Sequence, residues 1–293
     1  MLKKAKTWLD PKTPFGRQKP GQALAKWLNE LRQNFRSVQR LHLVRFCMLL
    51  TDKLRDTIED LYKSFASYHL RSNSGACPGC HSDFDEQRLH TKPLRKLTQE
   101  DLWLYAMDAL YTWGDENDFK HFLPRIFELL ALSHEGPIGF VDPAQVFTKL
   151  LYESHCSSSW RYWPSPEQEV IKDYFHAVWD AAINSEPEDL RFSSAHDWIC
   201  GIAQAEDDLS PYLGHWLLAP SLNAHRNLAA LVRRDLSYTK RSTGYWAGHE
   251  QQWEQVVAWL RRPDVREKLA SAVEKWGDSP FGGELLDAAV MLP

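Results

Sequence analysis

The segment that decides the fold lies at residues 92–131 and reads KPLRKLTQEDLWLYAMDALYTWGDENDFKHFLPRIFELLA. Near its start, Thr98 followed three residues later by Asp101 resembles a capping box, in which each side chain accepts a hydrogen bond from the other residue's backbone. Gly114 follows a run of apolar residues and suits the left-handed conformation that ends many helices. The spacing therefore predicts a helix that begins after Thr98 and runs to Trp113.

The same segment predicts a second helix. It begins near Asn117 or Asp118, either of which can cap a helix N-terminus. Beyond this point large apolar side chains recur every three or four residues, as on the buried face of a helix: Phe119, Phe122, Leu123, Ile126 and Leu130. Two successive helices joined by a short capped turn are typical of stacked antiparallel pairs.

Helical spacing continues on both sides of this pair. Further helices are predicted at residues 22–41, 51–69, 141–154, 164–184, 193–205, 221–236, 248–262 and 263–277. Two of them open on a cap followed by proline, at Asp142 with Pro143 and at Ser165 with Pro166. No stretch alternates apolar and polar residues with the period of two that strands require. We predict an all-α fold of stacked antiparallel helix pairs, HEAT-like or α-solenoid-like, without a clean sequence repeat.

The sequence suggests four parts. These are a basic N-terminal arm over residues 1–20, N-terminal helices over 21–72, a cysteine-containing loop over 73–97 and a helical body over 98–293. Because helical spacing starts again soon after the arm, residues 21–293 can also form one continuous domain.

Charge is distributed unevenly along the chain. Residues 1–45 hold 11 Lys and Arg against 2 Asp and Glu, which leaves 24 against 37 in the remainder. A basic arm can bind nucleic acid or an anionic membrane, but it can equally pair with its own acidic body, which we favour. Arg32, Arg36 and Arg40 share one helix face and form either a solvated ridge or a contact for an acidic partner. No nucleic-acid-binding motif accompanies them, so nucleic acid is the weaker expectation.

Cysteine usage and hydropathy predict a cytoplasmic protein. The five cysteines lie at positions 47, 77, 80, 156 and 200, an odd and scattered set that does not resemble a disulfide framework. The basic N-terminus is followed by no apolar signal region, and no run of about 18 apolar residues occurs. We therefore expect a reducing cytosol and no membrane association.

One motif carries chemistry. The stretch GACPGCHSDFDEQRLH, residues 75–90, sets Cys77 and Cys80 on either side of a Pro-Gly turn. Two thiolates at this spacing can hold a zinc ion, and a closed site needs two further ligands. His81 and His90 are nearest in sequence and complete the candidate metal site.

Other interpretations of this motif stay open. The two further ligands can instead come from His69, or from His155 with Cys156. A redox pair normally stands at a helix N-terminus after a strand, and no strand is predicted here. The order Cys-x-x-Cys-His also fits c-type haem attachment, which requires export. The simplest interpretation is two thiols in a polar loop.

A weaker candidate lies on the second helix of the opening segment. Lys120, His121 and Arg125 can bind an anion, or His121 can transfer a proton, but an ordinary exposed helix face uses the same residue types. No phosphate-binding glycine loop, metalloprotease, hydrolase or kinase motif is present. This favours a protein that is not an enzyme.

Residues from Cys77 to about Asn184 resemble an uncharacterised bacterial all-helical family. The likeness rests on CPGC at residues 77–80, on the opening segment with its TWGDENDFKHFLPR core, on VFTKLLYE at 146–153 and on YWPSPEQEVIKDYFHAVWD at 162–180. It implies an all-helical fold and a bacterial cytosolic setting, and it brings no catalytic residue with it.

Two functions follow as expectations. The first is a cytosolic interaction or scaffold protein that binds another macromolecule, most simply a protein. The second is a metal-dependent enzyme or sensor built around Cys77, Cys80 and the nearby histidines, with zinc as the metal.

Overall fold

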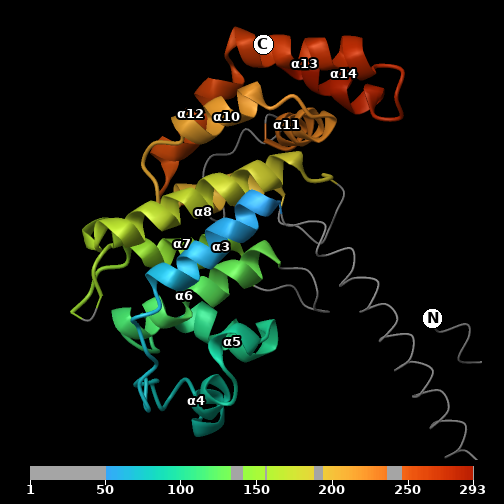
Figure 1. The fold of residues 1–293 in the computed structure, drawn as a ribbon. Coiled ribbons are helices and arrows are strands. Elements are labelled where there is room, and N and C mark those ends of the chain that lie inside the picture. The colour runs from blue at the N-terminus through green and yellow to red at the C-terminus, as the bar shows by residue number, and fades with distance from the viewer. Residues whose placement is uncertain (1–50, 133–140, 156, 188–193, 236–245, 293) are drawn as a thin grey trace, which may run out of the picture. The chain divides into compact units, whose positions relative to one another are not determined.

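The computed structural model describes residues 51–132, 141–155, 157–187, 194–235 and 246–292. These residues belong to one compact unit, which spans residues 50–293. Over the described ranges the chain forms twelve α-helices, three 3-10 helices and no strand (Figure 1). The all-α prediction is confirmed. The basic arm and the arginines at 32, 36 and 40 lie outside the described residues.

The helices have the following bounds. The first half contains α3 Asp52–Ser64, α4 Asp83–His90, α5 Gln99–Asp108, α6 Glu116–Ala131, α7 Pro143–Phe147 and α8 Ser165–Asn184. The second half contains α9 Ala195–Ala203, α10 Ser210–Leu218, α11 Leu222–Asp235, α12 Glu250–Leu260, α13 Pro263–Trp276 and α14 Gly282–Met291. The 3-10 helices are Leu94–Lys96, Thr148–Leu151 and Trp160–Tyr162.

Helix α5 begins as predicted but ends early. The Thr98 hydroxyl accepts from the Asp101 backbone nitrogen at 3.3 Å, and the Asp101 carboxylate accepts from the Thr98 nitrogen at 2.8 Å. The helix was expected to reach Trp113, yet it ends at Asp108. Leu110 adopts a left-handed φ of 68° and donates to the Trp113 carbonyl at 3.0 Å, which turns the chain before Gly114.

Helix α6 begins two to three residues earlier than predicted. Its cap is Asp115, whose carboxylate accepts from the Asp118 backbone nitrogen at 3.1 Å, while Asp118 accepts in return from the Asp115 nitrogen at 3.1 Å. Both aspartates thus share the capping role, because the D-x-x-D spacing satisfies two free backbone donors at once.

Other expectations about the helices differ from the structure, including the following three. The stretch 73–97, expected to be a loop, contains α4, which a capping box between Ser82 and Asp85 opens. The helix predicted over 141–154 is split into the short α7 and the 3-10 helix Thr148–Leu151. In α8 the cap position falls on Pro164 and the helix already includes Ser165.

Helix α8 organises the packing. It packs against α3, α9, α10 and α11, and α3 also lies alongside α6 (Figure 1). The polar ends of its large aromatic residues are paired: the Trp179 ring nitrogen donates to the Tyr212 carbonyl at 2.8 Å and the Tyr174 hydroxyl to the Phe127 carbonyl at 2.8 Å. This pairing allows both rings to be fully buried.

Neighbouring helices also pack in pairs. Helix α7 packs against α9, and α14 packs against both α11 and α13. These contacts are compatible with stacked helix pairs, but of these three pairs only α13 and α14 are consecutive along the chain, whereas the short capped turns led us to expect pairing between successive helices. In the described part of the chain, no helix combines the length and the apolar character needed to cross a bilayer.

Candidate functional site at the Cys77 to Cys80 turn

The two motif cysteines lie together at the surface. The Cys80 backbone nitrogen donates to the Cys77 carbonyl at 2.9 Å, which closes a four-residue turn over Pro78 and Gly79. Cys77 is half-buried and Cys80 is exposed, and neither forms a disulfide. The turn therefore presents a dithiol to solvent.

The two thiols differ in acidity. The backbone N–H of Gly79 donates to the Cys77 sulfur, and this contact, with the thiol of Cys80 as a second donor, lowers the pKa of Cys77. The hydrogen bond and the charge of Cys77 raise the pKa of Cys80, and the nearby carboxylate of Asp108 raises it further. Cys77 is thus the thiol that ionises first.

A strained turn supports the cysteines from one side. The Cys77 backbone nitrogen donates to the Thr112 carbonyl at 2.8 Å. Thr112 belongs to the turn after α5, where the left-handed Leu110 is the one non-glycine residue with positive φ in the described ranges. Such strain persists only where surrounding contacts enforce it. The carbonyl that holds Cys77 is therefore fixed in place.

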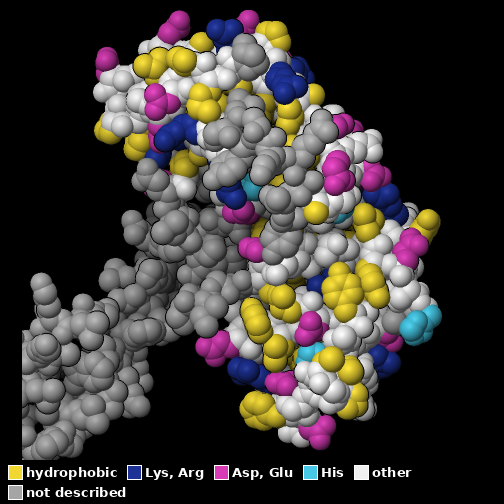
Figure 2. All heavy atoms as spheres, turned by 180° about the vertical axis from the view of Figure 1, so that it is seen from behind, with side chains coloured by type: hydrophobic (Ala, Val, Ile, Leu, Met, Phe, Trp, Pro, Cys, Tyr) yellow, Lys and Arg dark blue, Asp and Glu magenta, His cyan; other side chains and the backbone are white. Residues whose placement is uncertain are grey.

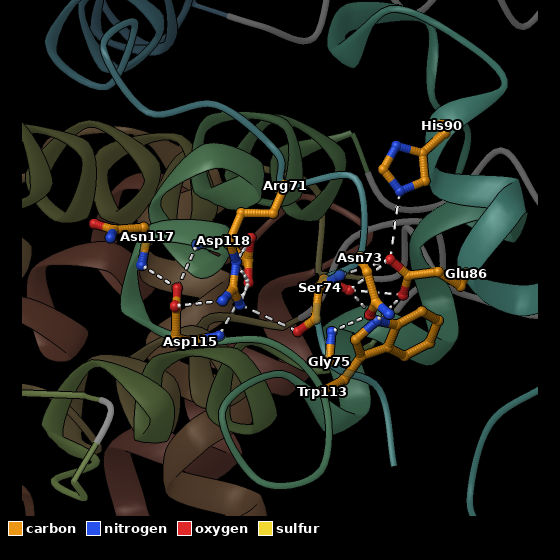
Figure 3. Close-up of polar contacts among 10 residues, drawn as sticks. All are labelled: Arg71, Asn73, Ser74, Gly75, Glu86, His90, Trp113, Asp115, Asn117 and Asp118. Carbon is orange, nitrogen blue, oxygen red and sulfur yellow. Dashed lines mark hydrogen bonds and ion pairs between the residues drawn. The ribbon is translucent and has the colours of Figure 1, made fainter. Parts of the chain in front are cut away.

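A second support joins the segment before the cysteines to α4 (Figure 3). Glu86 accepts from the Ser74 nitrogen at 2.9 Å, from the Ser74 hydroxyl at 2.6 Å and from the Trp113 ring nitrogen at 2.8 Å. Burial acts to raise the pKa of Glu86, but these hydrogen bonds outweigh it and the pKa lies below its usual value. Glu86 is thus held as a carboxylate.

A third support joins the same segment to the start of α6 (Figure 3). Arg71 donates through Nε to both carboxylate oxygens of the fully buried Asp118, at 3.2 Å each, and a second guanidinium nitrogen also contacts Asp118. Arg71 further pairs with Asp115 at 3.1 Å and donates to the Ser74 carbonyl at 3.2 Å. Both ends of the segment leading to Cys77 are therefore anchored.

The two candidate histidines do not join the cysteines. His81 is buried against the Trp113 ring, with its Nε2 3.2 Å from the Thr112 hydroxyl and 3.4 Å from Asp108. The Nε2 of His90 lies 3.4 Å from Glu86. Within the described ranges no three His, Cys, Asp or Glu side chains gather as metal ligands. Cys156, the alternative ligand, lies outside them, and zinc binding stays a prediction.

The residues predicted on the face of α6 are braced separately. Lys120 is 3% exposed and pairs with Glu116 at 2.9 Å and Glu167 at 3.0 Å. His121 contacts the Tyr68 carbonyl at 2.9 Å. The Arg125 guanidinium donates to the Leu97 carbonyl at 2.8 Å and pairs with Glu128 at 2.6 Å. The three side chains do not converge, and anion binding by them stays a prediction.

Sequence reasoning missed a buried lysine beside the turn. Lys149 is 2% exposed, donates to the Gln145 carbonyl at 2.8 Å and stands over the Tyr111 ring at 4.7 Å. Burial lowers the pKa of Lys149 to about 8, and the negative charge of Asp108 raises it only slightly. No sequence signal marks it, since its burial arises only when residues 148–151 fold onto the turn after α5.

Two exposed aromatic side chains belong to the segments that adjoin the cysteine turn. Phe84, in the first turn of α4, is 69% exposed, and Tyr111, next to the Thr112 carbonyl that binds Cys77, is 47% exposed. Asp83 and Asp108 lie beside them. Figure 2 shows hydrophobic side chains among acidic and basic ones over the lower part of the described surface, the end that holds α4 and α5 in Figure 1. We call Phe84, Tyr111, Cys77 and Cys80 the turn surface.

No family model, curated protein or solved structure matches the chain. The likeness of residues 77–184 to a bacterial helical family stays a prediction.

Proposed function

We propose that the protein is a helical interaction protein that binds a protein partner through the turn surface. One observation carries this proposal: two large aromatic rings stand exposed beside a turn that three separate sets of hydrogen bonds hold in place. Exposed aromatic side chains on a rigid support bind partners well because little conformational entropy is lost on association.

The charge around the turn surface specifies the partner further. Asp83 and Asp85 flank Phe84 along the chain, and the Asp108 carbonyl accepts from the Tyr111 backbone nitrogen at 3.1 Å. Asp85 is held ionised because hydrogen bonds from Ser82 lower its pKa. The chain beyond residue 45 carries 37 acidic against 24 basic residues, which repels nucleic acid. The partner that fits is a protein segment with apolar side chains flanked by Lys or Arg.

The rest of the helical unit acts as the scaffold. We place α10 to α14 in a HEAT-like or α-solenoid-like stack, because α10 packs on α12 and α13, and α14 packs on α11 and α13. The long-range packing of α3 on α8 departs from a strict repeat. A reducing cytosol is part of this proposal, and the odd, scattered set of cysteines supports it.

Variants of the exposed rings test this proposal. The tagged chain is recovered from its native cells beside a Phe84→Ala/Tyr111→Ala double variant, and co-purifying proteins are quantified by isotope-labelled mass spectrometry. We expect one partner to fall roughly tenfold in the double variant. Tyr162→Ala is the matched control, because Tyr162 is 77% exposed but lies before α8. An unchanged set of partners in the double variant would contradict the proposal.

A metal-dependent sensor or enzyme is the second candidate function. The observation that favours it is the pair of adjacent surface thiols, which suit zinc. Elemental mass spectrometry of protein purified under reducing conditions tests it beside a Cys77→Ser/Cys80→Ser variant. About one zinc per chain, lost in the variant, would support this function, and no metal in the wild type would exclude it.

A further inference from the structure

We propose that Cys77 and Cys80 form a site of reversible thiol–disulfide exchange whose substrates are disulfides of small thiols, such as glutathione disulfide. This activity goes beyond partner binding and needs no partner to be observed.

The backbone already has the geometry that a disulfide requires. Residues at the two ends of a hydrogen-bonded four-residue turn lie less than about 7 Å apart between Cα atoms, and disulfides span about 4.4–6.8 Å. The Cys80 backbone nitrogen donates to the Cys77 carbonyl at 2.9 Å, so the two cysteines stand at the two ends of such a turn. Closing the bond therefore requires side-chain rotation and no unfolding.

The surroundings give the two thiols different roles. The Cys77 sulfur lies close over Gly79, 3.9 Å from where a Cβ on that residue would stand, and the backbone of this turn lowers the pKa of the Cys77 thiol. Cys80 is the more exposed of the two and stands beside Asp108, which opposes ionisation. We therefore assign Cys77 as the attacking thiolate and Cys80 as the resolving thiol.

Hydrogen bonds hold the turn so that Cys77 and Cys80 stay close to each other and separate from the other metal-ligating side chains that the structure describes. Cys77 is tied to Thr112, and Ser74 is tied to Glu86. Across the described residues, no third His, Cys, Asp or Glu side chain joins the two sulfurs. The remaining described cysteine, Cys200, is buried in α9. Among the cysteines that the structure describes, each thiol of the pair thus has the other as its nearest reaction partner.

The reaction balances as two exchanges. The Cys77 thiolate attacks one sulfur of glutathione disulfide, a Cys77–glutathione bond forms as the glutathione S–S bond breaks, and one glutathione leaves as a thiolate. Cys80 then releases its proton to solvent and attacks the Cys77 sulfur, so the Cys77–Cys80 bond forms and the second glutathione leaves as a thiolate. The protein loses two electrons, which reduce the glutathione disulfide to two thiols.

A redox titration of the full chain tests the inference. Protein is equilibrated with glutathione and glutathione disulfide at graded ratios, quenched with acid, alkylated and digested with trypsin. Cleavage after Arg71 and Arg88 yields one peptide, residues 72–88, that contains Cys77 and Cys80 and no other cysteine. We expect this peptide to lose the mass of two hydrogen atoms in a single two-electron transition that reverses when glutathione is added back.

Single variants separate the two roles. In Cys80→Ser the mixed disulfide on Cys77 cannot be resolved, so its glutathione adduct should exceed that of the wild type by about tenfold. In Cys77→Ser the adduct on Cys80 should form about tenfold more slowly. Cys200→Ala is the control and should titrate as the wild type does.

Two results would overturn the inference. One is a wild-type peptide that carries alkyl groups or glutathione on each cysteine at every ratio and never the internal disulfide. The other is about one zinc ion per chain, released by a mercurial reagent, which would assign the pair to a metal site. Neither result bears on partner binding, which the Phe84 and Tyr111 variants test separately.

Discussion

At the scale of single residues, Lys149 is a buried charged side chain that destabilises the folded state. Its folded pKa of about 8 lies below the ordinary 10.5, so between these values the unfolded chain binds more protons than the folded chain. The free energy of unfolding therefore rises as pH increases from about 8. At pH 7 the full cost of burying the charged Lys149 applies. Lys149→Met keeps the apolar stem and removes the charge.

We expect Lys149→Met to raise the free energy of unfolding at pH 7 by about 1–3 kcal/mol and to flatten its increase between pH 7 and pH 9.5. Urea denaturation over this pH range measures both. Lys268→Met is the comparison: burial also lowers the pKa of Lys268 to about 8, but this lysine donates to two carbonyls, of Leu217 and Ala219, whereas Lys149 donates to one, of Gln145, so its loss removes more hydrogen bonds. A less stable Lys149→Met protein at pH 7 would contradict the account.

Two glycines give a matched test of the packing at the start of α6. Gly114 and Gly75 have nearly equal left-handed φ values of 77° and 75°. A Cβ at Gly114 would lie 3.1 Å from the Asp118 Cβ and 3.3 Å from the Tyr105 hydroxyl, whereas one at Gly75 would meet nothing within 4 Å.

Both glycine-to-alanine changes should destabilise the protein because of the left-handed backbone, by about 1 kcal/mol at Gly75 and about 2–4 kcal/mol at Gly114. Thermal and urea unfolding of the two variants measure the difference. Equal losses at the two positions would show that the close contacts around Gly114 contribute nothing.

At the scale of elements, the connection between α5 and α6 determines how the cysteine turn is held. The buried Asp118 caps α6 and binds Arg71 at the same time. We expect Asp118→Asn to lower stability by about 3 kcal/mol, since a half-exposed guanidinium loses its buried partner. It should also speed hydrogen exchange at Ser74 and Cys77, which mass spectrometry of residues 72–88 detects.

Asp52→Asn is the control for this prediction. Asp52 is also in the first turn of a helix and pairs with Arg55 at 2.7 Å, but its side chain is almost fully exposed and solvent screens the pair. It should leave both stability and exchange at Ser74 unchanged. Comparable effects from the two variants would mean that burial of Asp118 does not support the turn.

The same elements show which features the sequence can predict. The capping box at Thr98 and Asp101 was predicted correctly because it is a local pairing of neighbours. The early end of α5 was not predicted, because the residues Ala109 to Trp113 contain no Gly or Pro. Their turn depends on contacts with distant residues, since the Thr112 carbonyl accepts from Cys77 and the Trp113 ring nitrogen donates to Ser74. The local capping box predicts where α5 starts, whereas tertiary contacts determine where it ends.

At the scale of the whole unit, the sequence cannot show which polar side chains of the site have partners, because most of those partners are distant along the chain. The adjacency of Cys77 and Cys80 follows from their spacing, but the fold also gives His81 partners in Thr112 and Trp113 and gives Lys120 partners in Glu116 and Glu167, which the sequence does not reveal. The exposed rings of Phe84 and Tyr111 were not predicted, since a short helix and an irregular turn have no periodicity that marks an exposed face.

Site-specific photo-crosslinking tests the central claim, that the turn surface is where a protein partner binds. p-Benzoylphenylalanine replaces Phe84 in one chain and Tyr162 in another, since both positions are exposed and aromatic. Irradiation in the native cells should give one discrete intermolecular protein adduct from position 84 and none from position 162. No protein adduct from position 84, equal adducts from both positions, or a link from position 84 to the chain's own residues 1–45 would contradict the account.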